Sequence, residues 1–226
     1  MQPTILLFDI DGTLISSDGA GRRAVERAFL IRTGRADACT SFSFAGMTDR
    51  AIARRGLEAV GARADEAAID ELLAAYLGFL EESVRVAENY RLHDGIVAAL
   101  DHVAGRAGCA VGLGTGNLAA GARIKLGRVG IADRFAFGGF GSDAEDRTEL
   151  LRIGAERGAA LLGHAREACR VVVIGDTPRD VEAGHAIGAE VVAVATGPFT
   201  VEELRTYGPR FVYPDLAAAG ALGALL

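Results

Sequence analysis

The sequence has no apolar stretch that approaches the roughly 20 residues needed to cross a membrane. Its N-terminus has no basic segment, and Asp9 and Asp11 interrupt its first apolar run, so we expect no signal peptide. The net charge of −6 at pH 7 gives nucleic acid no general electrostatic reason to bind. We therefore expect a cytoplasmic protein whose partners include neither a membrane nor a nucleic acid.

Cysteine is also scarce, and the cysteines are not arranged in pairs. Cys39, Cys109 and Cys169 are far apart and show no CxxC or metal-type spacing. We expect structural thiols in a reducing compartment, not disulfides or a nucleophile. Half of the 226 residues are hydrophobic, so the chain can bury a substantial core as one large domain or as one domain with an insertion.

Several short apolar runs are typical of parallel strands that are buried on both faces. They cover residues 4–8, 110–114, 135–140, 171–174 and 191–194. Segments with helical spacing lie between the later runs, over 117–129, 146–158 and 179–187. This alternation predicts an α/β fold, a doubly wound parallel sheet with right-handed crossovers.

The interval 16–90 has a different character, because it contains no convincing strand. It is expected to form amphipathic helices over 21–31, 49–60 and 67–86. A helical stretch between the first and second strands predicts an inserted helical domain, with a core made of residues 1–15 and 91–226. The turn-prone crossings at 15–19 and 90–95 are expected to act as hinges.

Polar side chains follow the predicted strands at their carboxyl ends, where sheets of this kind bind ligands. These residues are Asp9, Thr115, Asp143 and Asp176. Asp11 follows Asp9 by two residues, and Asp180 follows Asp176 by four. Asp180 by itself could equally be an acid at a helix N-terminus. Two acidic strand ends in one sheet nevertheless predict a site for Mg²⁺, which prefers a few carboxylates, water and a phosphate.

These motifs resemble those of the haloacid dehalogenase-like (HAD) hydrolase superfamily. Its DxDGT motif is present at 9–13, its strand ending in Thr at 112–117, and its GDxxxD motif at 175–180. The resemblance covers essentially the whole chain and is greatest to the phosphoglycolate phosphatase-like branch. It implies a HAD-like Rossmannoid core and a C1-type cap in residues 16–90.

The resemblance also implies a mechanism and a role for each residue. Asp9 would be the nucleophile that forms an aspartyl-phosphate, and Asp11 would be the general acid and base. Asp9, Asp176 and the backbone carbonyl of Asp11 would hold Mg²⁺, and Asp180 would support them. The residues expected to bind the phosphate are Thr115, Gly116 and Asn117.

One motif departs from the family, because the usual lysine after the third strand is missing. Arg147 lies at about the expected position, at the start of the next helix, and its guanidinium can bind a phosphate. Alternatively, Arg147 is a surface cation paired with Glu145 or Asp146. The rival is Lys125, the only lysine of the chain. Lys125 could be a catalytic cation held by the acidic cluster at 143–146, or it could be a surface lysine. Against a catalytic role, Lys125 lies far along the helix from Thr115 and would reach it only awkwardly. The sequence favours Arg147 slightly.

The interval 16–90 limits the reaction further. It contains no lysine for a Schiff base, and His93, the first histidine, lies beyond it. By resemblance, these absences favour hydrolysis of a small phosphorylated metabolite over a phosphoglucomutase-like phosphoryl transfer. A catalytically weak binding or regulatory protein is a further alternative.

Substrate specificity is expected to depend on the cap. One of four arginines is expected to bind an anionic group of the substrate, and Arg50 is preferred over Arg54, Arg22 and Arg23. The protein is expected to be a monomer or a homodimer.

Overall fold

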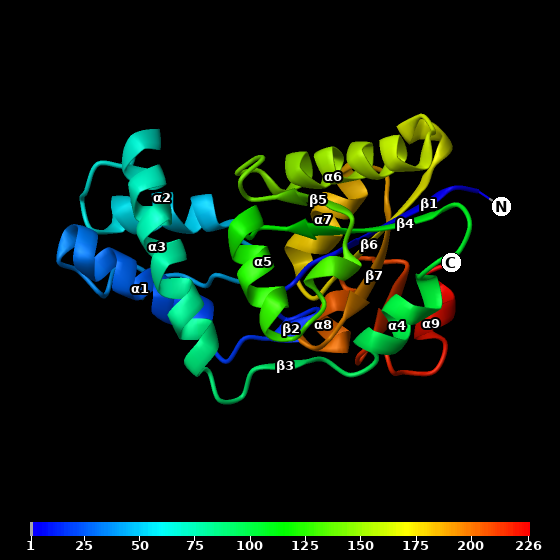
Figure 1. The fold of residues 1–226 in the computed structure, drawn as a ribbon, viewed down its shortest axis with the longest axis horizontal. Coiled ribbons are helices and arrows are strands. Elements are labelled where there is room, and N and C mark those ends of the chain that lie inside the picture. The colour runs from blue at the N-terminus through cyan, green and yellow to red at the C-terminus, as the bar shows by residue number, and fades with distance from the viewer. Residues whose placement is uncertain (1) are drawn as a thin grey trace.

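The computed structural model describes residues 2–226 and contains a six-stranded, entirely parallel sheet (Figure 1). In spatial order the strands are β5 (Phe137–Phe140), β4 (Cys109–Thr115), β1 (Thr4–Phe8), β6 (Arg170–Gly175), β7 (Glu190–Val194) and β8 (Phe211–Tyr213). The predicted α/β class and parallel sheet are confirmed. The strand order reverses at β1, so the carboxyl end of β1 is the place where such a sheet binds ligands.

Alternate residues of β1 pack into two separate hydrophobic layers, one on each face of the sheet. Ile5 and Leu7 belong to the layer below α6 (Arg147–Leu162), α7 (Pro178–Ala186) and α8 (Val201–Arg205). Leu6 and Phe8 belong to the layer below α4 (Ile96–Val103), α5 (Ala119–Arg128) and α9 (Ala221–Ala224). All four side chains are fully buried, which is why this strand reads as a continuous apolar run.

Three helices follow β2 (Ile15–Ser16) and form an insert with a hydrophobic core of its own. They are α1 (Ala20–Thr33), α2 (Asp49–Ala59) and α3 (Glu66–Val86). The chain returns through β3 (Arg91–Leu92), which pairs antiparallel with β2 at the base of the insert. The helical insert is thus confirmed, whereas its exact limits at 16 and 90 stay a prediction.

The insert lies beyond the end of the sheet that β1 points toward, and α3 lies beside α5 (Figure 1). Leu118 and Ile124, from the start and middle of the α5 segment, join the hydrophobic core of the insert. The backbone N–H of Asp49 in the insert donates to the carbonyl of Gly116 in the core at 2.8 Å. The two parts therefore meet at the carboxyl ends of the strands.

Short elements account for most differences from the sequence-based expectation. The strand expected from residue 135 begins at Phe137, and β2, β3, β8, α4, α8 and α9 were not predicted. These elements are two to eight residues long, too short for most periodic patterns to emerge. The remaining elements are 3-10 turns at Ala132–Arg134 and Arg166–Ala168. Among residues 2–226, no helix is both long and apolar enough to span a membrane.

Candidate active site

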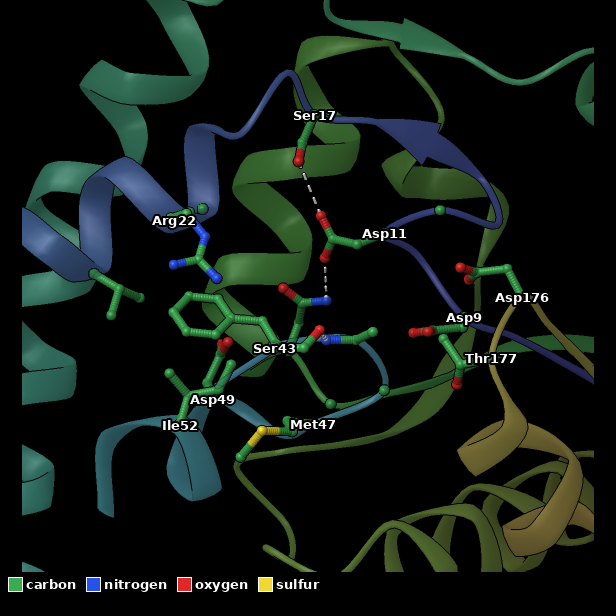
Figure 2. Close-up of a pocket in the computed structure, with 18 of the residues that line it drawn as sticks. Asp9, Asp11, Ser17, Arg22, Ser43, Met47, Asp49, Ile52, Asp176 and Thr177 are labelled. Carbon is green, nitrogen blue, oxygen red and sulfur yellow. Dashed lines mark hydrogen bonds between the residues drawn. The ribbon is translucent and has the colours of Figure 1, made fainter. Parts of the chain in front are cut away.

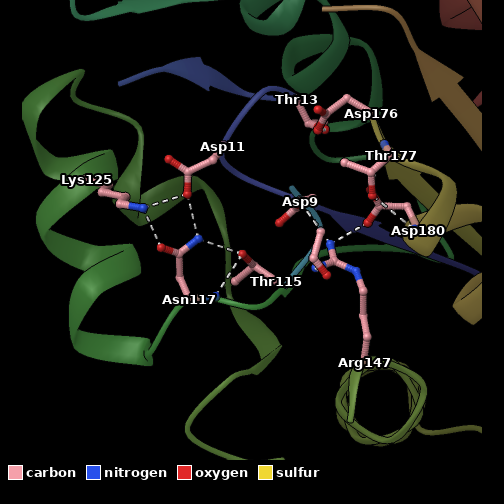
Figure 3. A network of polar contacts seen from close by, with 11 residues as sticks. Asp9, Asp11, Thr13, Thr115, Asn117, Lys125, Arg147, Asp176, Thr177 and Asp180 are labelled. Atoms are coloured by element: carbon pink, nitrogen blue, oxygen red, sulfur yellow. Dashed lines mark hydrogen bonds and ion pairs between the residues drawn. The ribbon is translucent and has the colours of Figure 1, made fainter. Parts of the chain in front are cut away.

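Strand register brings the acidic motifs to one edge of the sheet. Phe8 at the end of β1 is aligned with Leu113 of β4 and with Ile174 of β6. The residues at the end of each strand or just after it therefore emerge together, as Figure 3 shows for Asp9, Thr115 and Asp176. The N–H of Asp9 donates to the carbonyl of Ile174 at 2.9 Å, which extends the sheet by one residue into the site.

The loop after β1 holds Asp176 through two residues of the DxDGT motif. Gly12 has a φ of +83°, and a Cβ atom on it would lie 2.3 Å from Oδ2 of Asp176, so only glycine fits there without displacing the carboxylate. The next residue, Thr13, donates from Oγ1 to Oδ1 of Asp176 at 2.7 Å. The glycine and threonine of this motif thus position an aspartate 163 residues away.

Asp9, Asp176 and Asp180 form a buried acidic cluster, with one oxygen of each lying within 4.8 Å of the others. Burial raises the pKa of Asp9 and of Asp176, and the negative charge of Asp180 adds to both shifts. Such a cluster of hard oxygen atoms fits a divalent cation, which would offset the repulsion. The set differs from the expected one, because it contains the side chain of Asp180 and not that of Asp11. A contact through the backbone carbonyl of Asp11 stays a prediction.

Arg147 is the cation of this cluster. It is the first residue of α6, it is 8% exposed, and its Nη2 lies 2.8 Å from Oδ2 of Asp9. The same nitrogen donates to Asp180, and Nη1 donates to the carbonyl of Gly46 at 3.3 Å. Asp146 instead caps α6 by accepting from the N–H of Glu149 at 2.9 Å. The alternative of a surface cation for Arg147 is therefore wrong.

Lys125 is also buried, but it contacts the other aspartate of the DxDGT motif. Its Nζ lies 2.6 Å from Oδ2 of Asp11 and 2.6 Å from Oδ1 of Asn117. Asn117 donates from Nδ2 to Asp11 and to Oγ1 of Thr115, both at 2.9 Å (Figure 3). The reach is possible because long helical side chains point back toward the N-terminus of their helix. The surface-lysine alternative is wrong for this residue too.

The environment of Asp11 differs from that of Asp9. Its side chain is 40% exposed and faces the cavity, and Oδ1 accepts from the hydroxyl of Ser17 at 3.1 Å. Desolvation in the cavity opposes ionisation, but the charge of Lys125 and hydrogen bonds from Lys125, Asn117 and Ser17 lower the pKa of Asp11 overall. The two aspartates of one motif thus differ in acidity, and Asp11 is the one held in its ionised form, as a base that takes a proton from water requires.

The acidic stretch after β5 does not take part in this network. Asp143 accepts from both Nη atoms of Arg157, at 2.7 and 2.8 Å, and from the N–H of Phe140 at 3.0 Å. Glu145 accepts from Arg54 of the insert at 2.9 Å. The expectation that this cluster holds Lys125 is wrong, because Lys125 points into the cavity from α5 instead.

The site opens into a cavity of about 560 Å³ between the sheet and the insert. Figure 2 shows Asp9 and Asp176 on one side of it, Asp11 between, and Arg22 and Asp49 on the side of the insert. Gly116 and Asn117 line it as well, while Thr115 is fully buried behind them.

The four candidate arginines of the insert take different positions. Arg22 lines the cavity, with its guanidinium 4.0 Å from the centre of the Phe44 ring. Arg50, the preferred candidate, is paired with Asp70 at 2.7 Å and with Glu66, and it is not among the residues that line the cavity. Arg54 is paired with Glu145 and Glu66, and Arg23 donates to the carbonyl of Asp18 at 2.5 Å.

Two cavity residues, Asp49 and Tyr76, were given no role from the sequence. Asp49 begins α2, and its Oδ2 accepts from the N–H of Leu118 in the core at 2.8 Å. Burial, opposed by the charge of Lys125, raises the pKa of Asp49 to about 6. The local sequence pattern indicates that Asp49 is an ordinary acidic residue in the first turn of a helix. For Tyr76 it indicates a residue on the apolar face of α3. No local pattern reveals that both face the core.

The model of the haloacid dehalogenase-like hydrolase family matches residues 3–188. The chain belongs to this family. No curated protein sequence matches it significantly. Among solved structures, CbbY from Rhodobacter sphaeroides in complex with phosphate is similar, with a TM-score of 0.74 and 18% identity over 100% of this chain and 99% of that one.

A mutant of the same protein in complex with xylulose-(1,5)bisphosphate has a TM-score of 0.73 and 17% identity over the same shares, 100% and 99%. A predicted phosphoglycolate phosphatase from Haemophilus somnus 129PT has a TM-score of 0.70 and 16% identity over 100% of this chain and 98% of that one. At these identities the likeness concerns the fold, which is that of a capped HAD enzyme.

Proposed function

We propose that this HAD-like hydrolase is a Mg²⁺-dependent phosphatase of small phosphomonoesters, with Asp9 as its nucleophile. The observation that carries the proposal is the placement of Asp9 and Asp11. Both carboxylates face one cavity, yet Asp9 lies in the acidic cluster beside Arg147 whereas Asp11 is paired with Lys125. Such an arrangement supplies a nucleophile and a separate acid–base group on the same substrate.

The proposed reaction has two steps. In the first, a carboxylate oxygen of Asp9 attacks phosphorus, the bond from phosphorus to the ester oxygen breaks, and Asp11 gives a proton to that oxygen. In the second, Asp11 takes a proton from water, which attacks the phosphorus of the aspartyl-phosphate and releases phosphate and free Asp9. Splitting the hydrolysis in this way replaces one difficult step by two easier ones.

The remaining residues stabilise charge. Arg147 would bind phosphoryl oxygens with its guanidinium, and the N–H groups near Gly116 and Asn117 would bind others. Asp9 and Asp176 would be ligands of Mg²⁺, with Asp180 holding Arg147 in place and Asp11 adding its backbone carbonyl. Mg²⁺ supplies a positive charge that offsets the repulsion between the carboxylates and the incoming phosphate.

Two alternative functions are less well supported. A phosphoglucomutase-like transfer is disfavoured because residues 16–90 contain neither histidine nor lysine to protect the aspartyl-phosphate from water. A binding or regulatory role without catalysis is disfavoured because Asp9, Asp11 and Asp176 line the cavity together with both cations. The solved structures bound to phosphate and to a sugar bisphosphate support a small phosphorylated metabolite as substrate. Phosphoglycolate is one candidate, by analogy with the phosphoglycolate phosphatase-like neighbour.

The proposal is tested by measuring release of p-nitrophenol from p-nitrophenyl phosphate, with and without Mg²⁺. We expect Mg²⁺-dependent turnover by the wild type and none by Asp9→Asn. The matched control is Asp101→Asn, which alters an exposed aspartate paired with Arg134 and is expected to keep full activity. Undiminished turnover by Asp9→Asn, or none by the wild type, would contradict the proposal.

A further inference from the structure

Tyr76 of α3 has a hydroxyl group that forms no hydrogen bond within the part of the chain that the structure describes. The residue is only 2% exposed. Its hydroxyl is nevertheless not among the fully enclosed polar atoms that lack a partner, so it is open to the cavity. A tyrosine hydroxyl in the wall of a cavity can donate a hydrogen bond to a molecule that occupies the cavity. Tyr76 lines the cavity that contains Asp9 and Asp11, so a molecule bound in this cavity can supply the missing partner.

Asp49 lines the same cavity as Tyr76 and has one carboxylate oxygen without a donor among residues 2–226. Both residues line the main cavity and also a small void behind it. Oδ2 of Asp49 is occupied by the N–H of Leu118, while Oδ1 has no donor among the described residues. Burial raises the pKa of Tyr76 and the charge of Asp49 raises it further, so Tyr76 stays protonated and can donate. The pair therefore presents one donor and one anionic acceptor.

This pair is complementary to an alcohol group more than to other polar groups. An alcohol can donate its proton to Oδ1 of Asp49 and accept a hydrogen bond from Tyr76 at the same time. An ammonium group has no lone pair for Tyr76, and a carboxylate would be repelled by Asp49. Val25 and Ile52 line the cavity nearby and leave apolar surface for a carbon chain.

We propose that Tyr76 and Asp49 form a subsite for a hydroxyl group of the leaving alcohol, so that the enzyme prefers phosphate monoesters of polyols and sugars to those of simple alcohols. The proposal rests on the proposed phosphatase function. It assigns recognition of the leaving alcohol to residues of α2 and α3, and Figure 2 shows Asp49 of α2 across the cavity from Asp9 and Asp176.

The test compares kcat/KM for glycerol 3-phosphate and for propyl phosphate, which have three carbons each but differ in two hydroxyl groups. We expect the wild type to prefer glycerol 3-phosphate, and Tyr76→Phe to lower this preference about tenfold, as the loss of one hydrogen bond to the substrate predicts. Tyr213→Phe is the matched control. Its hydroxyl donates to the carbonyl of Gly220 at 3.3 Å outside the cavity, and its loss is expected to leave the preference as in the wild type.

If Tyr76→Phe does not fold, Asp49→Asn decides the question, because it keeps an acceptor for Leu118 and is expected to lower the same preference. Turnover of p-nitrophenyl phosphate without a preference for glycerol 3-phosphate overturns the subsite alone. So does a preference that neither variant changes. Absence of turnover with all three esters contradicts the phosphatase function, and the subsite falls with it.

Discussion

Nζ of Lys125 lies 2.6 Å from Oδ2 of Asp11, whereas Nη2 of Arg147 lies 2.8 Å from Oδ2 of Asp9. Two aspartates that are two residues apart in one loop are thus neutralised by cations from different helices, α5 and α6. The sequence offered these cations as rivals for one role. Their positions assign them separate partners.

Removal of Arg147 and removal of Lys125 are expected to have different effects on catalysis and on phosphate binding. Arg147→Ala should lower kcat about 100-fold or more, in the range seen when one group that binds developing charge is removed. It should also weaken competitive inhibition by inorganic phosphate, because Arg147 is the cation beside the nucleophile. Lys125→Ala should lower kcat while leaving inhibition by phosphate largely unchanged. Equal weakening of phosphate inhibition in both variants would contradict separate roles, and Arg147→Lys is expected to recover part of the loss.

Gly12→Ala is expected to impair binding of the metal. A Cβ atom on Gly12 would meet Asp176 at 2.3 Å, and the residue has a φ of +83°. Gly188→Ala is the matched control, because Gly188 has a φ of +69° with nothing within 4 Å. Both variants should lose about 1 kcal/mol or more from the left-handed conformation. Only Gly12→Ala should raise the Mg²⁺ concentration that gives half-maximal activity, and an equal rise in the control would refute the explanation.

Asp176→Asn is expected to separate stability from metal binding. Burial and the charges of Asp180 and Asp9 raise the pKa of Asp176, so its ionised form destabilises the metal-free protein. Without divalent ions, the variant should therefore have a Tm at neutral pH at least equal to that of the wild type. Added Mg²⁺ should raise the Tm of the wild type by mass action but not that of the variant. An equal rise in both proteins would argue against Asp176 as a ligand.

Stability is expected to depend on pH through Asp49. Its pKa rises from 3.8 to about 6 on folding, so the folded state binds this proton more tightly than the unfolded chain does. The resulting stability is complete below pH 4 and is lost as the pH rises through about 6. Asp49→Asn has no proton to lose and can still accept from Leu118. Between pH 4 and pH 7 it should gain on the order of 3 kcal/mol relative to the wild type. Urea unfolding of both proteins at several pH values measures the difference, and parallel curves would contradict it.

The sheet could be predicted because its central strands are buried on both faces, so that Thr4–Phe8 and its neighbours read as unbroken apolar runs. The convergence of Asp9 and Asp176 followed from parallel strands alone. By contrast, β8 (Phe211–Tyr213) is short and only half-buried, so its sequence carries no clear pattern.

The parts of the site that the sequence did not reveal depend on packing between helices. The axial distance along α5 from Asn117 to Lys125 suggested that Lys125 could not easily reach the site. That distance takes no account of the direction of the side chain, which points back toward the N-terminus of the helix. Asp49 and Tyr76 lie on helices whose local patterns are those of an ordinary cap and an ordinary apolar face. Only the docking of α2 and α3 against the core turns them toward Asp11, and no spacing in the sequence encodes that docking.

Arg147 contacts the carbonyl of Gly46 in the insert as well as Asp9 and Asp180 in the core. A swing of the insert wide enough to admit a substrate would break the first of these contacts. The guanidinium would then be anchored only by the carboxylates, and a second N–H group, besides the Nε–H that already has no partner among residues 2–226, would be free for the phosphate. The same movement of the insert would thus admit the substrate and release an N–H group of Arg147 to bind its phosphate.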